Sequence, residues 1–243
     1  MVAGDTTVYL ANSSLLGVVW LAILALATSH SGRARRIALV GSVPAVAMAG
    51  AYFGMHLEIL TFETEGRDQS VVRFFGYTLV ALSLAYLLRT FIRLERRSMY
   101  LLFGLLLVAY WSQFVSWFVS GAVESLVTLV TLAMFASIAY LLYVPYNTIA
   151  RNEGGKRRLF YAKIRDVFLV CNVALVLTSV ASEQVLEILT TFVSTVAAGY
   201  IDLVLMATIG FLTVSAAGIF EETDGSSDDT VGADVTAGTA GDD

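Results

Sequence analysis

The chain has 243 residues, of which 57% are apolar and 14% are charged, and its formal net charge is −5. This composition excludes an ordinary soluble domain and favours a protein whose helices cross a membrane several times. The acidic balance gives no basis for nucleic-acid binding. The single cysteine, Cys171, excludes a disulfide within the chain and a thiolate metal site.

Seven apolar blocks follow one another along the chain, each long enough to cross a bilayer. They fall at about residues 8–29, 37–60, 71–92, 99–120, 123–147, 164–181 and 189–220. We therefore predict an all-α membrane protein with one seven-helix transmembrane domain over residues 1–220. Because the connections are short, sequential helices should be antiparallel neighbours in one bundle. The lipid bilayer would surround this bundle.

The basic residues indicate how the helices are oriented. Thirteen of the 15 Lys and Arg residues lie in or beside connections on one side of the membrane. These residues are Arg33, Arg35, Arg36, Arg89, Arg93, Arg96, Arg97, Arg151, Lys156, Arg157, Arg158, Lys163 and Arg165. The positive-inside rule places these connections in the cytoplasm. We therefore predict a multi-pass protein of the cell membrane, with its N-terminus outside and its C-terminus inside.

Residues 221–243 differ from the rest of the chain. They hold eight acidic residues and no basic one, and their removal would change the formal charge from −5 to +3. A segment of this composition cannot bury enough apolar surface to fold, so we predict an acidic, disordered cytoplasmic tail. Acidic polar segments suit a cytoplasm at very high salt, which indicates a halophilic source.

A few polar residues lie inside or beside the apolar blocks. Asp202 is the only charge between residues 193 and 220, and Arg73 opens the third block. A charge in a membrane span is costly and needs a partner, a water-filled cavity or access to the interface. For Arg73, both a carboxylate partner and a position at the outer surface remain open. Asn172, in the middle of the sixth block, fits either an interhelical hydrogen bond or a site.

Several segments, in order along the chain, carry a family resemblance. They are segment 43–47 around Pro44, Arg73 followed one turn later by Tyr77, segment 140–144, and Asp202 followed by Gly210 and Phe211. With these features the chain resembles the microbial (type I) rhodopsins, and most closely their haloarchaeal bacteriorhodopsin branch, over about residues 8–220. The resemblance implies a seven-helix bundle of the bacteriorhodopsin type.

The chain departs from this family at the position that binds the chromophore. The resemblance implies that a lysine four residues after the helix-seven aspartate forms a Schiff base with retinal, and here that position is Met206. A thioether cannot form an imine, and the two lysines of the chain, Lys156 and Lys163, are in or beside a cytoplasmic connection. We therefore predict an opsin-related variant with no covalently bound cofactor.

Other positions that matter in the family have changed as well. By the resemblance, the primary counterion position falls on Gly76, the proton-donor position on Leu87, and an outer glutamate position on Ser194. The tryptophan and proline positions of helix six fall on Asn172 and Val176. We therefore predict a vestigial retinal pocket. Its residues are Met206, Gly76, Tyr77, Asn172 and Val176.

The same resemblance brings Arg73 and Asp202 together. In the family these two charges lie in the outer half of the bundle core, so we predict an ion pair between them, direct or bridged by water. Tyr77 or Tyr52 would supply a hydroxyl partner. We favour a pair that fixes helix packing over one that acts on a ligand, because breaking a buried pair from one side costs about 3–5 kcal/mol.

These features predict a light-independent interaction, regulatory or signalling protein that is not an enzyme. Its partner would be another membrane protein or a second copy of itself. A non-covalent binder of retinal, a carotenoid or a lipid is the alternative, since an apolar cavity lined by methionine suits such ligands. Light-driven ion transport or photosensing, which the fold would imply, is disfavoured because the chemistry is missing.

Overall fold

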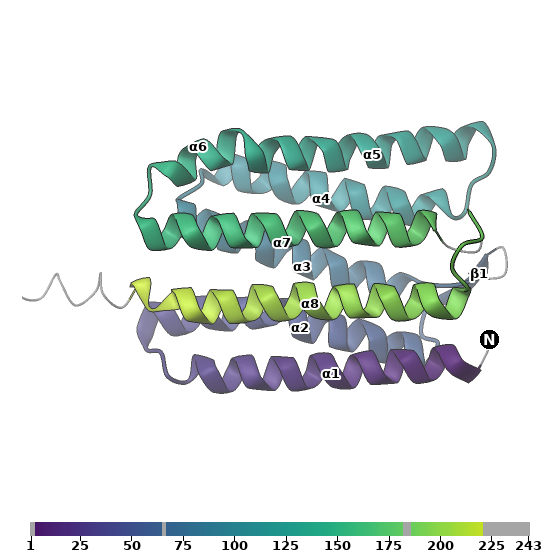
Figure 1. Cartoon of the computed structure of the whole chain (residues 1–243), viewed down its shortest axis with the longest axis horizontal. Helices are drawn as coiled ribbons and strands as arrows, with labels where there is room; N and C mark the ends of the chain where they lie inside the picture. The colour runs from purple at the N-terminus through teal and green to yellow at the C-terminus, as the bar shows by residue number, and fades with distance from the viewer. Residues whose placement is uncertain (1–2, 65–66, 182–185, 221–243) are drawn as a thin grey trace, which may run out of the picture.

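A computed structural model describes residues 3–64, 67–181 and 186–220, and these form eight α-helices and one β-hairpin. The elements are α1 (Ala3–Ala27), α2 (Gly32–His56), β1 (Thr61–Thr64), β2 (Arg67–Ser70), α3 (Val71–Ile92), α4 (Arg96–Ser116), α5 (Ala122–Tyr143), α6 (Pro145–Arg151), α7 (Gly155–Val180) and α8 (Thr191–Ala217). Figure 1 shows the long helices lying side by side along the long axis of the molecule. The predicted all-α bundle is confirmed. The prediction for residues 221–243 lies outside the described residues.

The fifth and sixth predicted spans differ from the structure at their ends. The fifth is divided into α5 and the short α6, which begins at Pro145 because proline has no N–H to continue the helix. The sixth corresponds to α7, which starts at Gly155 rather than near residue 164. A helix can continue past the bilayer where its side chains are charged, so the apolar block marks the membrane boundary and not the helix end.

By length and composition, six helical segments of the described chain can cross a membrane. They are Thr6–Ala27, Gly32–His56, Val71–Ile92, Arg96–Ser116, Ala122–Arg151 and Thr191–Ala217. Helix α7 completes the bundle but is not among them, because its first half is rich in lysine and arginine.

The connection between α2 and α3 contains structure that the sequence analysis did not predict. Helix α2 ends at His56 and not near residue 60, and β1 pairs with β2 in an antiparallel hairpin. The turn before the hairpin places Glu58 at φ 57° and Leu60 at φ 51°. His56 donates a hydrogen bond from Nδ1 to the carbonyl oxygen of Thr6 at 3.0 Å, which holds the end of α2 against α1.

Helix α8 packs closely against α1 and α2 because small residues face these neighbours. A Cβ atom on Gly210 would lie 2.1 Å from Ile23 Cδ1, and a Cβ on Gly199 would lie 2.0 Å from Asn12 Nδ2. The backbone of α8 therefore approaches α1 more closely than any larger residue would allow. This approach places Asp202, one turn after Gly199, in the interior of the bundle, where it is fully buried.

The two ends of the bundle differ in charge. The α1–α2, α3–α4 and α6–α7 connections meet the end of α8 at one end, at the left of Figure 1. We call this the basic end, because the basic residues of the three predicted cytoplasmic connections lie there. The hairpin and the start of α1 lie at the opposite end.

Candidate functional site

The candidate site is centred on the contact between Arg73 and Asp202. Arg73 lies in the first turn of α3 and Asp202 in the middle of α8. The Arg73 Nη2 atom donates to Asp202 Oδ2 at 3.0 Å, so the contact is direct and no bridging water is needed. The side chain of Asp202 is 0% exposed and that of Arg73 is 21% exposed. The carboxylate is therefore sealed inside the bundle, whereas the arginine keeps some access to its outer surroundings.

Two tyrosines complete the site, and we call Arg73, Asp202, Tyr52 and Tyr77 the ion-pair cluster. The Tyr52 hydroxyl donates to Asp202 Oδ2 at 2.6 Å. The Tyr77 hydroxyl lies 3.0 Å from both carboxylate oxygens and accepts from Arg73 Nε at 3.2 Å. The sequence predicts Tyr77 or Tyr52 as the hydroxyl partner, and the structure brings both to the carboxylate. The cluster thus joins α2, α3 and α8.

The ion-pair cluster balances its own charge. One guanidinium faces one carboxylate, and both carboxylate oxygens receive hydrogen bonds. The guanidinium carbon of Arg73 also lies 5.8 Å from the ring centre of Tyr52 and 5.5 Å from that of Tyr77, within the range of cation–π attraction. Such an arrangement offers no unpaired charge to a cationic ligand, and it restrains three helices relative to one another.

A second polar contact adjoins the cluster and involves Asn172. The ring of Tyr110 stacks on that of Tyr77 with their centres 5.1 Å apart, and its hydroxyl donates to Asn172 Oδ1 at 3.4 Å. Asn172 Nδ2 in turn donates to the carbonyl oxygen of Phe168 at 2.8 Å, within α7. Both ends of the Asn172 amide are engaged in contacts within α7 and between α7 and α4. This geometry favours the interhelical interpretation of Asn172.

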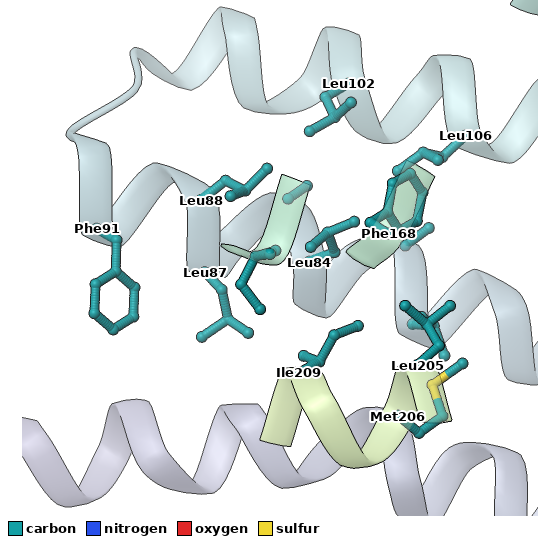
Figure 2. Close-up of a cluster of buried hydrophobic side chains, with 14 of the residues drawn as sticks. Leu84, Leu87, Leu88, Phe91, Leu102, Leu106, Phe168, Leu205, Met206 and Ile209 are labelled. Carbon is teal, nitrogen blue, oxygen red and sulfur yellow. The ribbon is translucent and has the colours of Figure 1, made fainter. Parts of the chain in front are cut away.

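Met206 lies one helical turn beyond Asp202 and is fully buried. Figure 2 shows it within a cluster of buried hydrophobic side chains. The labelled neighbours in this cluster are Leu84, Leu87, Leu88 and Phe91 of α3, Leu102 and Leu106 of α4, Phe168 of α7, and Leu205 and Ile209 of α8. The side chain of Met206 is therefore part of the hydrophobic core.

Comparison with solved structures identifies the architecture. The crystal structure of a cyanorhodopsin from the cyanobacterium Calothrix superposes with a TM-score of 0.81 at 14% sequence identity, covering 89% of this chain and 96% of that one. The thermophilic rhodopsin from Rubrobacter xylanophilus gives a TM-score of 0.79 at 15% identity, over 88% and 96% of the two chains. The chain has the rhodopsin fold.

A further rhodopsin-fold relative is the light-driven proton pump of Coccomyxa subellipsoidea. Its crystal structure gives a TM-score of 0.78 at 13% identity, covering 88% of this chain and 97% of the pump. Neither the protein-family models nor the curated protein sequences give a match. The similarity therefore concerns the three-dimensional arrangement of the helices, and it extends over almost the whole length of these rhodopsins.

Gly76 lies where the rhodopsin resemblance places the counterion, and the space beside it is filled. A Cβ atom on Gly76 would lie 2.9 Å from Met48 Sδ and 3.0 Å from Ala51 Cβ, both on α2. A carboxylate at this position would have to displace one of these side chains. The remaining predicted pocket residue, Val176, is half-buried on α7.

Some contacts around the site were not anticipated from the sequence. Trp111 Nε1 donates to Thr78 Oγ1 at 3.1 Å, which ties α4 to α3 beside the cluster. Asn12 of α1 packs on Gly199, and its buried amide nitrogen has no hydrogen-bond partner within the described part of the chain. A glycine three residues before a buried aspartate is the one sequence feature that could have indicated this close contact.

The described residues contain no group of three or more His, Cys, Asp or Glu side chains placed to hold a metal ion. His30 binds the carbonyl oxygen of Val214 through Nε2 at 3.1 Å, at the basic end, whereas His56 lies at the opposite end. Cys171 is buried on α7.

Proposed function

We propose that this rhodopsin-fold protein is a retinal-free member of the haloarchaeal branch that works without light. It would act in the cell membrane as an interaction, regulatory or signalling protein and not as an enzyme, and its partner would be another membrane protein or a second copy of itself. The observation that carries the proposal is the fully buried thioether of Met206, one turn beyond Asp202.

The first support is chemical. A Schiff base requires a primary amine within reach of the chromophore, and Met206 has none. The chain has two lysines, Lys156 and Lys163, and both lie in the first half of α7, towards the basic end. A retinal bound in the core would therefore have no amine with which to form an imine.

The second support is electrostatic. A protonated imine in the core would need a negative partner, because an unpaired charge is costly in a membrane interior. Asp202 is already paired with Arg73 at 3.0 Å, and the space beside Gly76 is occupied by Met48 and Ala51. This charge pattern suits a bundle without a bound cation. The protein would then act mainly through surfaces that bind other proteins.

The test is reconstitution with all-trans retinal, followed by a visible spectrum before and after acid denaturation. The parent protein should give no absorption band that survives denaturation. The matched control is Met206→Lys, which restores the amine at the same position of the fold. A covalent adduct in the parent would overturn the proposal. A red-shifted band that is lost on denaturation would favour the alternative, a non-covalent binder of retinal or a carotenoid.

A second experiment addresses the mode of action. Chemical cross-linking in native membranes, in darkness and under illumination, should give the same cross-linked species in both conditions. Purified protein in nanodiscs should show no light-induced change in the pH of the surrounding medium. A light-dependent change in either measurement would contradict light-independent action and would favour transport or photosensing.

A further inference from the structure

Exposed apolar side chains gather at the hairpin end of the bundle, opposite the basic end in Figure 1. Residues 57–62 run from the end of α2 into β1, and their four apolar side chains are 48–55% exposed. The α4–α5 connection adds a half-buried tryptophan and a phenylalanine that is 45% exposed. These six residues, which we call the apolar rim, are Leu57, Ile59, Leu60, Phe62, Trp117 and Phe118. The rings of Phe62 and Phe118 meet edge-on with their centres 6.3 Å apart, so the two connections form one surface.

The length of α4 places this part of the rim at the edge of a bilayer. Helix α4 begins with Arg96 and Arg97 at the basic end and holds 21 residues, a length of roughly 30 Å. The hydrocarbon core of a bilayer has about the same thickness. Residues 98–123 contain no charged side chain that would mark an exit into water. The residues that follow α4 therefore lie at the boundary between acyl chains and headgroups.

The segment after α2 is held in an unfavourable backbone conformation. Leu60 has φ 51° and Glu58 has φ 57°, in the left-handed region that bulky residues rarely adopt. Backbone hydrogen bonds fix the segment, from Ile59 N to Gly54 O at 2.9 Å and from Val71 N to Leu60 O at 3.1 Å. The fold thus accepts strain in a segment whose apolar side chains stay exposed. Packing within the protein does not explain this arrangement, whereas an apolar environment around the rim does.

The aromatic part of the rim is held in place by buried rings. Trp117 packs edge-on against Phe74, which is buried, with the ring centres 5.5 Å apart. Phe114 lies between Phe74 and Phe118, at 4.9 and 4.8 Å between ring centres. The indole nitrogen of Trp117 makes no hydrogen bond within the described part of the chain, whereas that of Trp111 donates to Thr78. An indole with an apolar body and an available N–H suits the headgroup boundary.

We propose that the apolar rim inserts into the membrane leaflet at the hairpin end and contacts lipid where the acyl chains meet the headgroups. The rim then holds the ends of α2 and α4 at a fixed depth in that leaflet. Salt screens charges but leaves apolar burial in place, so this contact persists at high ionic strength. The inference does not depend on whether the protein binds retinal.

The first experiment measures the depth of Trp117 by fluorescence quenching. The full chain with Trp20→Phe and Trp111→Phe is placed in nanodiscs of phosphatidylcholine brominated either near the glycerol or near the methyl end of the acyl chains. Trp117 should lose more fluorescence with bromine near the glycerol. The profile should be the same at low salt and at about 1 M salt, where screening acts within about 3 Å.

The matched control keeps Trp111 as the one tryptophan, with Trp20→Phe and Trp117→Phe. Trp111 lies six positions earlier, roughly 9 Å deeper along α4, so bromine near the methyl end should quench it more than it quenches Trp117. Strong quenching of Trp117 by aqueous iodide and weak quenching by both lipids would place the rim in water. Weak quenching by iodide and by both lipids would assign the rim to a protein partner or a second copy. Either result would overturn the proposal.

A second measurement tests the α2–β1 side of the rim. A nitroxide at Leu60→Cys, with Cys171→Ala, should collide more often with oxygen, which dissolves in lipid, than with a water-soluble nickel chelate. The control is Asn152→Cys, an exposed position in the α6–α7 connection, where the preference should be reversed. A preference for the nickel chelate at Leu60→Cys would contradict insertion.

Substitution of Phe118 tests whether its apolar character seats the rim. In the protein that keeps Trp117 alone, Phe118→Asp should raise quenching by iodide and lower quenching by bromine near the glycerol. Phe118→Leu stays apolar and should keep the lipid profile of the parent. An unchanged profile in Phe118→Asp would overturn the proposal.

Discussion

Arg73 and Asp202 are separated by 129 positions in the sequence, yet Nη2 and Oδ2 of their side chains meet at 3.0 Å. The two partners are buried to different degrees, because Asp202 is sealed from solvent and Arg73 is 21% exposed. This difference means that the two sides of the pair will respond differently to mutation. The pair also links α3 to α8, two helices that are far apart in the sequence.

We predict that Arg73→Met is more destabilising than Asp202→Leu. Removing the arginine leaves a fully buried carboxylate unpaired, which costs about 3–5 kcal/mol. Removing the carboxylate leaves an arginine that can turn towards its exposed side, so the cost falls to about 1–3 kcal/mol. The free energy of unfolding, measured by denaturant titration in mixed micelles, distinguishes the two.

The double variant Arg73→Met with Asp202→Leu is the control for this prediction. It removes both charges, so its stability should lie closer to that of the parent than to that of Arg73→Met. A double variant as unstable as the sum of its two parts would show that the side chains contribute independently. The pair would then have no coupling energy.

The two tyrosines of the ion-pair cluster should also differ. Tyr52→Phe removes one hydrogen bond to the carboxylate and should cost about 1.5–3 kcal/mol. Tyr77→Phe also removes the acceptor of Arg73 Nε, so we expect a larger loss. Tyr140→Phe, at an exposed position of α5, is the matched control and should change the unfolding free energy by less than about 0.5 kcal/mol. Equal losses at both cluster positions would contradict the hydrogen-bond assignment.

Glycine substitutions test the close contact between α2 and α3. Gly76→Ala forces its new methyl group against Met48 and Ala51, which should cost about 1–3 kcal/mol. Gly76→Asp, which restores the carboxylate implied by the rhodopsin resemblance, should cost more because it adds an unpaired buried charge. Gly104→Ala is the control, since its Cβ would meet no atom within 4 Å and alanine stabilises a helix by about 1 kcal/mol relative to glycine. The midpoint temperatures of thermal unfolding of the three variants give the order of their stabilities.

The arrangement of helices could be predicted because bilayer thickness imposes the length of each apolar block. The third block, 71–92, coincides with α3. The same rule could not locate the start of α7, since charged residues continue that helix beyond the apolar region. Nor could it find the pairing of β1 with β2, because these short strands show no clear hydrophobic alternation.

The site was partly predictable for a related reason. Arg73 and Asp202 are isolated charges in apolar surroundings, so each needed a partner, and the family resemblance supplied the pairing. The contact between Tyr110 and Asn172 could not be predicted, because it depends on the rotation of α4 relative to α7. Arg33 and Arg157 were interpreted only as part of the orientation signal. Their convergence on the ring of Phe220 depends on which helix ends become neighbours in the folded bundle.

The contact between α1 and α8 provides the last prediction. Gly199→Ala would place a methyl group against the Asn12 amide, with the Cβ 2.0 Å from its nitrogen, and should cost about 1–3 kcal/mol. Asn12→Ala removes the obstructing amide, so the double variant should recover most of this loss. Gly17→Ala on α1 is the control, because a Cβ there meets nothing within 4 Å. Unfolding free energies of the four proteins measure the coupling. Additive losses in the double variant would mean that α1 and α8 do not meet at these two residues.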